Sequence, residues 1–284
     1  MKTNTICGYP GGKTKLLKEI LPIIESYYLN NPQCKSYYEP LFGMGAIGIE
    51  LLKNPKIENY YFADSDASLM AMWFTVIDQP SALIDKLENY TPSVEKFFEF
   101  RDELTKVVDV PLGQEAILDM AFKKIVLHQT SFSSVGMCGS VHGGIKQDIS
   151  KVGDRYNPSN LKIKINNINN LCKQKNVQFQ HINFFDNLDK IYDNTFTYLD
   201  PPYVNMGKRV YKDYFELESH YKLKAYIDKM RPTSWLLSYD NNDFIKELYK
   251  DCEIKELAMI YTITVNKRSQ ARSELLIRNK EGSD

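Results

Sequence analysis

Two consecutive prolines, Pro201 and Pro202, follow a run of β-branched and aromatic residues at 195–199. Such a run is typical of a strand that is buried on both faces. Proline has no amide hydrogen for the sheet and fixes the backbone angle φ, so the strand has to end at Leu199. Asp200 therefore stands at the carboxyl end of a buried strand, which is the end where ligands bind in an open α/β sheet.

The segment from Asp200 to Tyr203 carries the groups that would hold a planar base with an exocyclic amine. The amine would donate hydrogen bonds to the Asp200 carboxylate and the Pro201 carbonyl, while the ring of Tyr203 would stack on the base. A strand followed by a plain proline turn explains the same residues equally well. The choice between the two interpretations therefore depends on the other motifs of the chain.

A glycine-rich turn near the amino terminus is the next informative feature. A short strand at 37–39 leads into Gly43, Gly45 and Gly48, which fit the pattern G-x-G-x-x-G. A second strand then ends on Asp64, about twenty residues later, as in nucleotide-binding folds. Glycines let the backbone approach a ligand closely, and the carboxylate can accept hydrogen bonds from ribose hydroxyls. The pattern predicts an adenosine-containing ligand, and a dinucleotide, a nucleoside cofactor or a purely structural turn would each fit it.

An earlier glycine-rich segment, 8–13, precedes a helical period. Its ending, Gly12-Lys13-Thr14, is like that of a phosphate-binding P-loop. However, Cys7 stands where the P-loop spacing requires a glycine, and there is little chain before it to form the preceding strand. The sequence therefore disfavours a phosphate-binding loop.

The order of predicted elements indicates an α/β fold with an insertion. A chain of 284 residues fits one large domain with an insertion, or two domains. After residue 170, strands that alternate with helix or turn signals are predicted at 177–182, 195–199, 235–239, 256–265 and 274–278. Between 79 and 170 helical periods predominate, and they end in a Ser- and Gly-rich stretch, 131–153, that we expect to be a long loop without regular structure. We therefore predict a catalytic domain of 1–78 and 171–284 and an inserted, mostly helical domain of 79–170.

Charge and cysteine content restrict the partners. Lys plus Arg and Asp plus Glu both total 36, so a nucleic-acid surface would have to be a local patch. The five cysteines include no Cys-x-x-Cys pair, which fits a reducing compartment, and His128, Cys138 and His142 lack a fourth metal ligand. No apolar run of about 18 residues or signal-peptide core is present, so we expect a cytoplasmic protein without a membrane span or bound metal.

Taken together, these stretches resemble the Dam-type DNA adenine-N6 methyltransferases, the D12 class. The order of the motifs is similar: an aromatic-x-G-G-K motif at 9–13, an E-P-F-x-G-x-G motif seen here as Glu-Pro-Leu-Phe-Gly-Met-Gly at 39–45, the acidic strand end at Asp64, an insertion, and D-P-P-Y at 200–203. The resemblance covers most of the chain outside the insertion.

The resemblance implies a Rossmann-like S-adenosylmethionine-dependent methyltransferase fold, in which 79–170 is the target-recognition domain. It implies transfer of a methyl group from S-adenosylmethionine to the N6 amine of an adenine that is flipped out of double-stranded DNA. The residues that it assigns to the cofactor are Tyr9, Pro10, Lys13, Phe42, Gly43, Gly45, Asp64, Asn183, Phe184 and Asp200. The residues that it assigns to catalysis are Asp200, Pro201, Pro202 and Tyr203. From their charge and position we expect DNA contacts by Arg155, Lys208, Arg209, Lys267, Arg268 and Arg272.

Two departures from the family pattern bear on the details. Asn183 stands where many relatives carry Asp, which affects one expected cofactor contact. The insertion also lacks the R-x-x-F-N-G-L and F-N-V-P-x-G-R-Y stretches of the relatives that recognise GATC, and the segments in their place, 131–139 and 153–158, differ in sequence. The GATC specificity is therefore not carried over.

Several other functions fit part of the sequence. An NAD-dependent Rossmann enzyme would use the glycine turn and Asp64, but would leave the Asp200 turn and 8–13 unexplained. A nucleic-acid-binding relative without catalysis would use the same pocket only to hold a base. Methylation of another amine, cytosine N4 or RNA adenine, is a third alternative, although Asp200 rather than Ser favours adenine. A base deaminase is disfavoured because its zinc signature is missing. The sequence predicts neither the target site nor the oligomeric state, and it fits a restriction-modification enzyme, a phage enzyme or an orphan regulator.

Overall fold

The computed structural model describes residues 5–8, 11–147, 151–188, 194–204, 215–230, 234–261 and 270–280, with the backbone alone at 259–261 and 270–272. Within these ranges seven strands form one sheet in the order β3-β2-β1-β4-β5-β7-β6. The strands are β1 (Ser36–Glu39), β2 (Asn59–Asp64), β3 (Asn176–His181), β4 (Thr195–Leu199), β5 (Trp235–Asp240), β6 (Glu253–Tyr261) and β7 (Gln270–Arg278). The predicted Rossmann-like α/β fold is confirmed.

The first five strands run parallel, and their order reverses beside β1. β1 pairs in parallel with both β2 and β4, while β3 and β5 extend the sheet on either side. β7 lies antiparallel between β5 and β6. The carboxyl ends of β1, β2 and β4 therefore meet at one edge, and a reversal of strand order at such an edge opens a crevice for a ligand.

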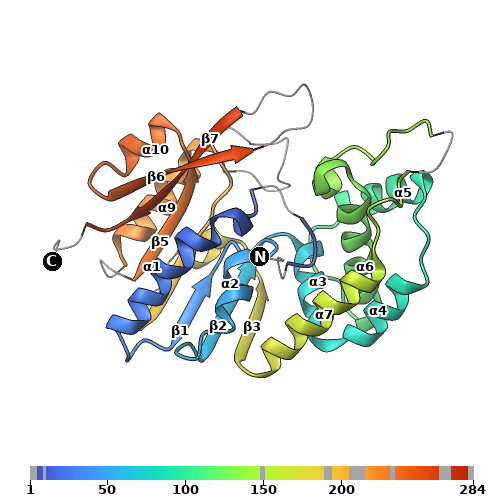
Figure 1. Cartoon of the computed structure of the whole chain (residues 1–284), viewed down its shortest axis with the longest axis horizontal. Coiled ribbons are helices and arrows are strands. Elements are labelled where there is room, and N and C mark those ends of the chain that lie inside the picture. Colours follow the sequence, from blue (N-terminus) through green and yellow to red (C-terminus); the bar gives the residue numbers. More distant parts are fainter. Residues whose placement is uncertain are drawn as a thin grey trace.

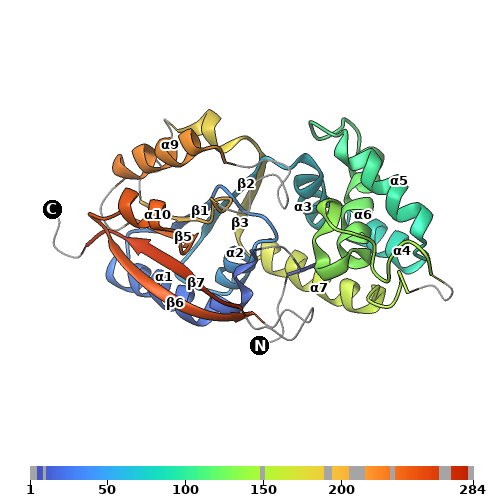
Figure 2. The ribbon, with the colours of Figure 1, turned by 90° about the horizontal axis from the view of Figure 1, so that it is seen from above.

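Both faces of the sheet are covered, which explains why the central strand β4 is buried along its whole length. Leu236 and Leu276 join a core with α1 (Leu17–Asn30) and α2 (Ala46–Leu51). Leu237 and Leu275 join the opposite core, with side chains of α9 (Leu217–Asp228) and α10 (Asp243–Leu248). Successive side chains of a strand point to opposite faces, so both cores are built from the same strands. Figure 2 shows α1 and α9 on opposite sides of the sheet.

A group of helices packs beside the β3 edge of the sheet (Figure 1). It consists of α3 (Ala67–Asp78), α4 (Pro80–Glu88), α5 (Val94–Thr105), α6 (Gln114–Thr130) and α7 (Pro158–Lys173). Asp66 starts the group, because its carboxylate caps α3 by accepting from the backbone amides of Ser68 and Leu69. The apolar faces of these helices continue the core on the α1 side of the sheet. The limits 79–170 and the recognition role of this range stay predictions.

The stretch expected to be a long loop without regular structure, 131–153, is described at 131–147 and 151–153, and the expectation is wrong for 131–142. The chain forms 3-10 turns at Phe132–Ser134 and Gly136–Cys138, and Ser131 bridges to Val141. His142 also donates its backbone amide to the Thr130 carbonyl at the end of α6. Gly136 adopts a φ of 69°, which lets the chain turn back on the helix. The glycine at this position thus provides a tight turn. Among the described helices, none is both long and apolar enough to cross a membrane.

Candidate active site

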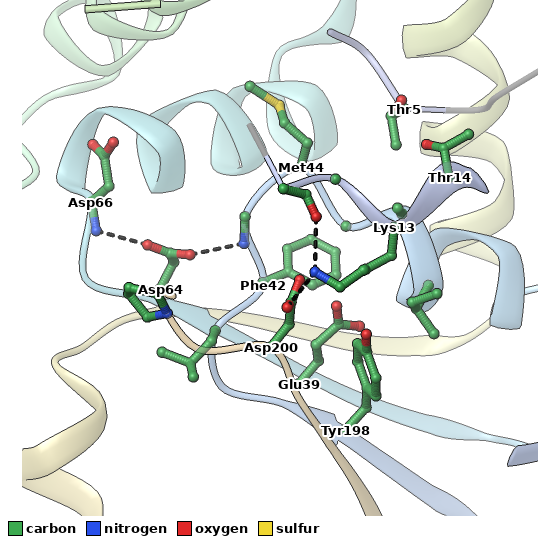
Figure 3. A pocket seen from close by; sticks show the side chains of 18 of the residues that line it. Thr5, Lys13, Thr14, Glu39, Phe42, Met44, Asp64, Asp66, Tyr198 and Asp200 are labelled. Carbon is green, nitrogen blue, oxygen red and sulfur yellow. Dashed lines mark hydrogen bonds and ion pairs between the residues drawn. The ribbon is translucent and has the colours of Figure 1, made fainter. Parts of the chain in front are cut away.

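A cavity of about 390 Å³ opens at the carboxyl edge of the sheet, above β1, β2 and β4 (Figure 3). Its volume is in the range of small-molecule sites. Its wall comes from four separate parts of the sequence: the amino-terminal segments 5–8 and 11–15, Glu39 with the turn 41–47, the loop 64–66, and the residues Tyr198, Asp200 and Pro202 at the end of β4 and just after it. Phe215 completes the lining. Elements far apart in the sequence thus meet at the reversal of strand order.

The glycine turn forms one side of the cavity and depends on the absence of side chains. Gly43 and Gly45 have φ angles of 54° and 65°, and a Cβ on Gly45 would lie 2.3 Å from the ring of Phe42. The turn is held from behind by Trp73 of α3, whose indole nitrogen donates to the Gly43 carbonyl at 2.9 Å. On its other side the Gly43 amide donates to Oδ2 of Asp64 at 2.8 Å. The glycines therefore serve a rigid, close-packed turn.

The loop after β2 contains a buried ion pair. Asp64 accepts from the backbone amide of Asp66 as well as from that of Gly43, as Figure 3 shows. Burial raises the pKa of Asp64 to about 6. Burial alone would also raise the pKa of Asp66, but the Lys124 ammonium of α6, 2.6 Å away, holds it far below its ordinary value. Lys124 thus ties the helical group to the loop that carries Asp64.

Lys13 is the centre of a second buried network, at the other end of the cavity. Its Nζ atom lies 2.5 Å from Oδ1 of Asp200 and 3.2 Å from Oε1 of Glu274. It also donates to the hydroxyl of Tyr203 at 2.9 Å, and that hydroxyl donates to Glu274 at 2.5 Å. Ser238 of β5 donates a further hydrogen bond to Oδ1 of Asp200 at 2.9 Å. The Asp200 side chain is held rigidly and is still 22% exposed.

Acidic groups outnumber basic ones around Lys13. Glu39, at the end of β1, is 3% exposed and accepts a hydrogen bond from Tyr37. Burial raises the pKa of Glu39, Asp200 and Glu274, and Lys13 opposes the rise in each case. Burial on its own would lower the pKa of Lys13, but neighbouring acids, Asp200 first among them, raise it well above its ordinary value. Among the described residues, one ammonium therefore faces three carboxyl groups, of which those of Glu39 and Glu274 are buried, and such a site favours a cationic ligand or a proton donor.

The structure brings together most of the described residues that were predicted to bind a cofactor. Those that line the cavity are Lys13, Phe42, Gly43, Gly45, Asp64 and Asp200. Asn183 and Phe184 do not line it. The Asn183 side chain accepts from the amide of Phe185 at the start of a 3-10 turn, and the Phe184 ring packs on Tyr226 in the α9 core. Tyr9 and Pro10 lie outside the described residues.

Only part of the predicted catalytic segment, 200–203, lies at the cavity. Asp200 and Pro202 line the cavity, whereas Pro201 and Tyr203 are buried and do not line it. The hydroxyl of Tyr203 belongs to the Lys13 network, and Lys13 lies 4.9 Å from the centre of its ring. The role that sequence assigned to Tyr203 rested on the ring face, so this hydroxyl contact is new.

The predicted DNA-contacting residues are mostly beyond what the structure describes. Arg155 is exposed in the turn before α7. Lys208, Arg209, Lys267 and Arg268 lie outside the described residues, and Arg272 is described only by its backbone in β7.

Sequence reasoning assigned no role to three buried charges in or beside the cavity: Glu39, which begins the motif at 39–45, Lys124 and Glu274. A signal existed for Glu274, because it is the one charged residue in the otherwise apolar run 274–277. A charged side chain in a buried strand usually has a partner.

Within the described ranges no group of three or more His, Cys, Asp or Glu side chains could hold a metal ion.

Comparisons with known proteins agree with this geometry. Residues 9–263 match the family described as D12 class N6 adenine-specific DNA methyltransferase. The type II methyltransferase M.MjaIII of Methanocaldococcus jannaschii is 24% identical over 305 aligned positions, which cover 98% of this chain and 100% of that protein. The type II methyltransferase M1.LlaDCHI of Lactococcus lactis subsp. cremoris is 22% identical over 281 positions, which cover 95% of this chain and 93% of that protein.

Proposed function

This chain belongs to the D12 class of N6 adenine-specific DNA methyltransferases, and we propose that it takes the methyl group from S-adenosylmethionine bound in the cavity at the carboxyl edge of the sheet. The family membership makes it a site-specific DNA methyltransferase that acts on the N6 amine of adenine. The identity of the methyl donor and the role of each residue are parts of the proposal.

The observation that carries the proposal is the surplus of buried carboxyl groups around Lys13. When bound, S-adenosylmethionine supplies a methyl group on a positively charged sulfonium, and a site with more acids than bases suits that charge. Gly43 and Gly45 line the cavity and present no side chain to the cofactor at these two positions. Asp64 lines the same cavity and would accept from the ribose hydroxyls.

Asp200 is proposed to hold the target amine. Within the described residues, the contacts of its carboxylate with Lys13 and Ser238 are both made by Oδ1. Oδ2 would accept one amine hydrogen, and in the DNA-bound state the carbonyl of Pro201, which does not line the cavity here, would accept the other, so that the nitrogen lone pair is aimed away from both acceptors. As positive charge develops on the nitrogen, the nearby carboxylate stabilises it and accepts the released proton. Extrusion of the adenine costs a few kcal/mol, offset by contacts in the pocket.

Tyr203 has a different place in this proposal from the one that its sequence suggested. The residue is only 9% exposed, so a flipped base has little ring surface to stack on in this state of the protein. Its hydroxyl is engaged by Lys13 and Glu274. We therefore assign Tyr203 a role through its hydroxyl in this state, and stacking on the base is reserved for the DNA-bound state.

The helical range 79–170 is proposed to select the DNA site, with phosphate contacts by Arg155, Lys208, Arg209, Lys267, Arg268 and Arg272. Both relatives are named type II methyltransferases, which supports a role beside a restriction enzyme. The substrate would then be double-stranded DNA in the cytoplasm.

Calorimetry tests the cofactor assignment directly. S-adenosylmethionine should bind the purified protein with one set of sites, whereas NAD should give no heat of binding. Glu256→Gln changes an exposed acid on β6 that does not line the cavity. This variant serves as a control for loss of an acid elsewhere on the protein, and it should bind the cofactor like the wild type. Binding of NAD with no response to S-adenosylmethionine would overturn the proposal.

A further inference from the structure

Glu274 is an acid in the buried interior of the sheet. It lies on β7, is 4% exposed, and is followed by Leu275, Leu276 and Ile277, which are all buried. A buried carboxylate costs several kcal/mol unless it is paired. The partners that offset this cost for Glu274 are Lys13 and Tyr203, beside Asp200. The position of the acid therefore points to a role at the Asp200 site.

We propose that Glu274 is a positioning residue for methyl transfer: with the Tyr203 hydroxyl, it holds the Lys13 ammonium against Asp200. The inference rests on the proposed function, because it assumes that Asp200 binds the amine of the target base. It adds to that function a residue from the last described strand that does not line the cavity itself.

The direction of the hydrogen bonds is fixed by chemistry. An ammonium has only donors, so the Tyr203 hydroxyl must accept from Lys13 and has one hydrogen left to donate. That hydrogen goes to Oε1 of Glu274 at 2.5 Å, and the same oxygen lies 3.2 Å from Nζ of Lys13. Lys13, Tyr203 and Glu274 therefore close a triangle of contacts. Loss of the negative charge on this side chain would weaken the hydrogen bond from the phenol and would free the ammonium on that side.

The triangle matters because the ammonium group of Lys13 is carried on a long, flexible side chain. Among the described residues, its other polar contacts are the Gly11 carbonyl at 2.8 Å and Asp200 at 2.5 Å. Without Glu274, the ammonium can move relative to Oδ1 of Asp200. A displacement of this kind changes how the carboxylate is oriented and how much of its charge is neutralised.

Titratable groups from several described elements surround Asp200, among them Tyr203 just after β4. Lys13 precedes α1, Glu39 ends β1, Tyr198 lies on β4, Tyr239 on β5 and Glu274 on β7. A neutral group in place of Glu274 removes one negative charge from this set. Asp200 would then ionise at a lower pH than in the wild type.

The test compares Glu274→Gln with the wild type and with the control Glu256→Gln, an exposed acid on β6 that bonds to Asn241 and Lys246. We expect Glu274→Gln to lower kcat about tenfold or more, as for a lost hydrogen bond to a charged group, while Kd for S-adenosylmethionine by calorimetry stays within about threefold. The acid limb of the kcat profile should move to lower pH. The control should match the wild type in all three measurements.

A variant with wild-type kcat and an unmoved pH profile would overturn the inference, and so would a parallel loss of cofactor binding and turnover, which marks a structural role. If Glu274→Gln fails to fold, Tyr203→Phe decides, because it removes the hydroxyl from the triangle and keeps the carboxylate. It should lower kcat at unchanged cofactor affinity, and wild-type behaviour would contradict the inference. Absence of N6-methyladenine with the wild-type enzyme would overturn the proposed function, and the inference with it.

Discussion

Two buried lysines stand at opposite ends of the cavity, and their surroundings differ in charge balance. Both side chains are 3% exposed. Lys124 forms an ion pair with one carboxylate, that of Asp66, at 2.6 Å. Lys13 lies within salt-bridge distance of two carboxylates, those of Asp200 and Glu274.

The difference separates a structural charge from one that is available for chemistry. The pKa of Asp66 lies far below its ordinary value despite burial, because Lys124 neutralises it. The pKa values of Asp200 and Glu274 are raised by burial, and a single shared ammonium does not reverse the rise. Asp66 is thus a stably ionised carboxylate that holds the loop after β2 in place. Asp200 remains able to exchange a proton or to stabilise a cation.

The largest effect that distinguishes the two ends is expected from Asp200→Ala. Single-turnover methylation should slow by about a thousandfold, the size of effect seen when a charge-stabilising or proton-accepting group is lost. Affinity for DNA, carried mainly by phosphate contacts, should change little. Asp200→Asn keeps the shape without the charge and should also be severely impaired. Full activity of a folded Asp200→Ala protein would make the segment purely structural.

At the other end, Lys124→Met should reduce stability rather than rate. Removal of one partner leaves Asp66 buried and unpaired, and the unfolding free energy in urea at pH 7 should fall by about 3–5 kcal/mol. The double variant Lys124→Met/Asp66→Asn carries no unpaired charge and should recover more than half of that loss. Equal stability of the single and double variants would show that the two charges are not coupled.

Substitution of Asp64 tests whether the end of the cavity beside the Asp66–Lys124 ion pair also binds the cofactor. Asp64→Asn should weaken S-adenosylmethionine binding by about tenfold to a hundredfold, since a charged acceptor is lost. Because burial raises the pKa of Asp64 to about 6, its carboxylate is formed only above that pH. Wild-type affinity should therefore rise as the pH increases through 6, and calorimetry should find a flatter profile in the variant. Identical profiles would remove Asp64 from the cofactor site.

The smallest effect is expected from substitution of Arg155, which does not line the cavity. The exposed side chain lies in the turn before α7 and is proposed to contact a DNA phosphate. Arg155→Ala should reduce the slope of log affinity against log salt by about 1 and leave kcat nearly unchanged. An unchanged slope would mean that Arg155 is only a solvated surface residue.

The local chemistry of the site was predictable from the sequence, because each motif carries its own geometry. Glycines with φ near 60° form the turn, and the acids that end or follow strands, Asp64 and Asp200, meet at one edge of a parallel sheet. These features depend on short segments, so periodicity and spacing reveal them.

The partners of these acids were not predictable, because sheet order sets them. Lys13 and Tyr203 are 190 residues apart, and Tyr203 and Glu274 are 71 apart. Glu274 reaches the site only because β7 inserts between β5 and β6, and nothing local in the sequence specifies that order. The same holds for Lys124 and Asp66, which are 58 residues apart.

The most direct test of the central claim is the identity of the methylated nucleoside. The wild-type protein is incubated with S-adenosylmethionine labelled in its methyl group and with double-stranded DNA, and the DNA is digested to nucleosides and separated. The label should appear in N6-methyladenine, and Asp200→Ala processed in parallel should give almost none. Label in N4-methylcytosine, or transfer to RNA but not to DNA, would contradict the claim that the Asp200 site methylates adenine in DNA.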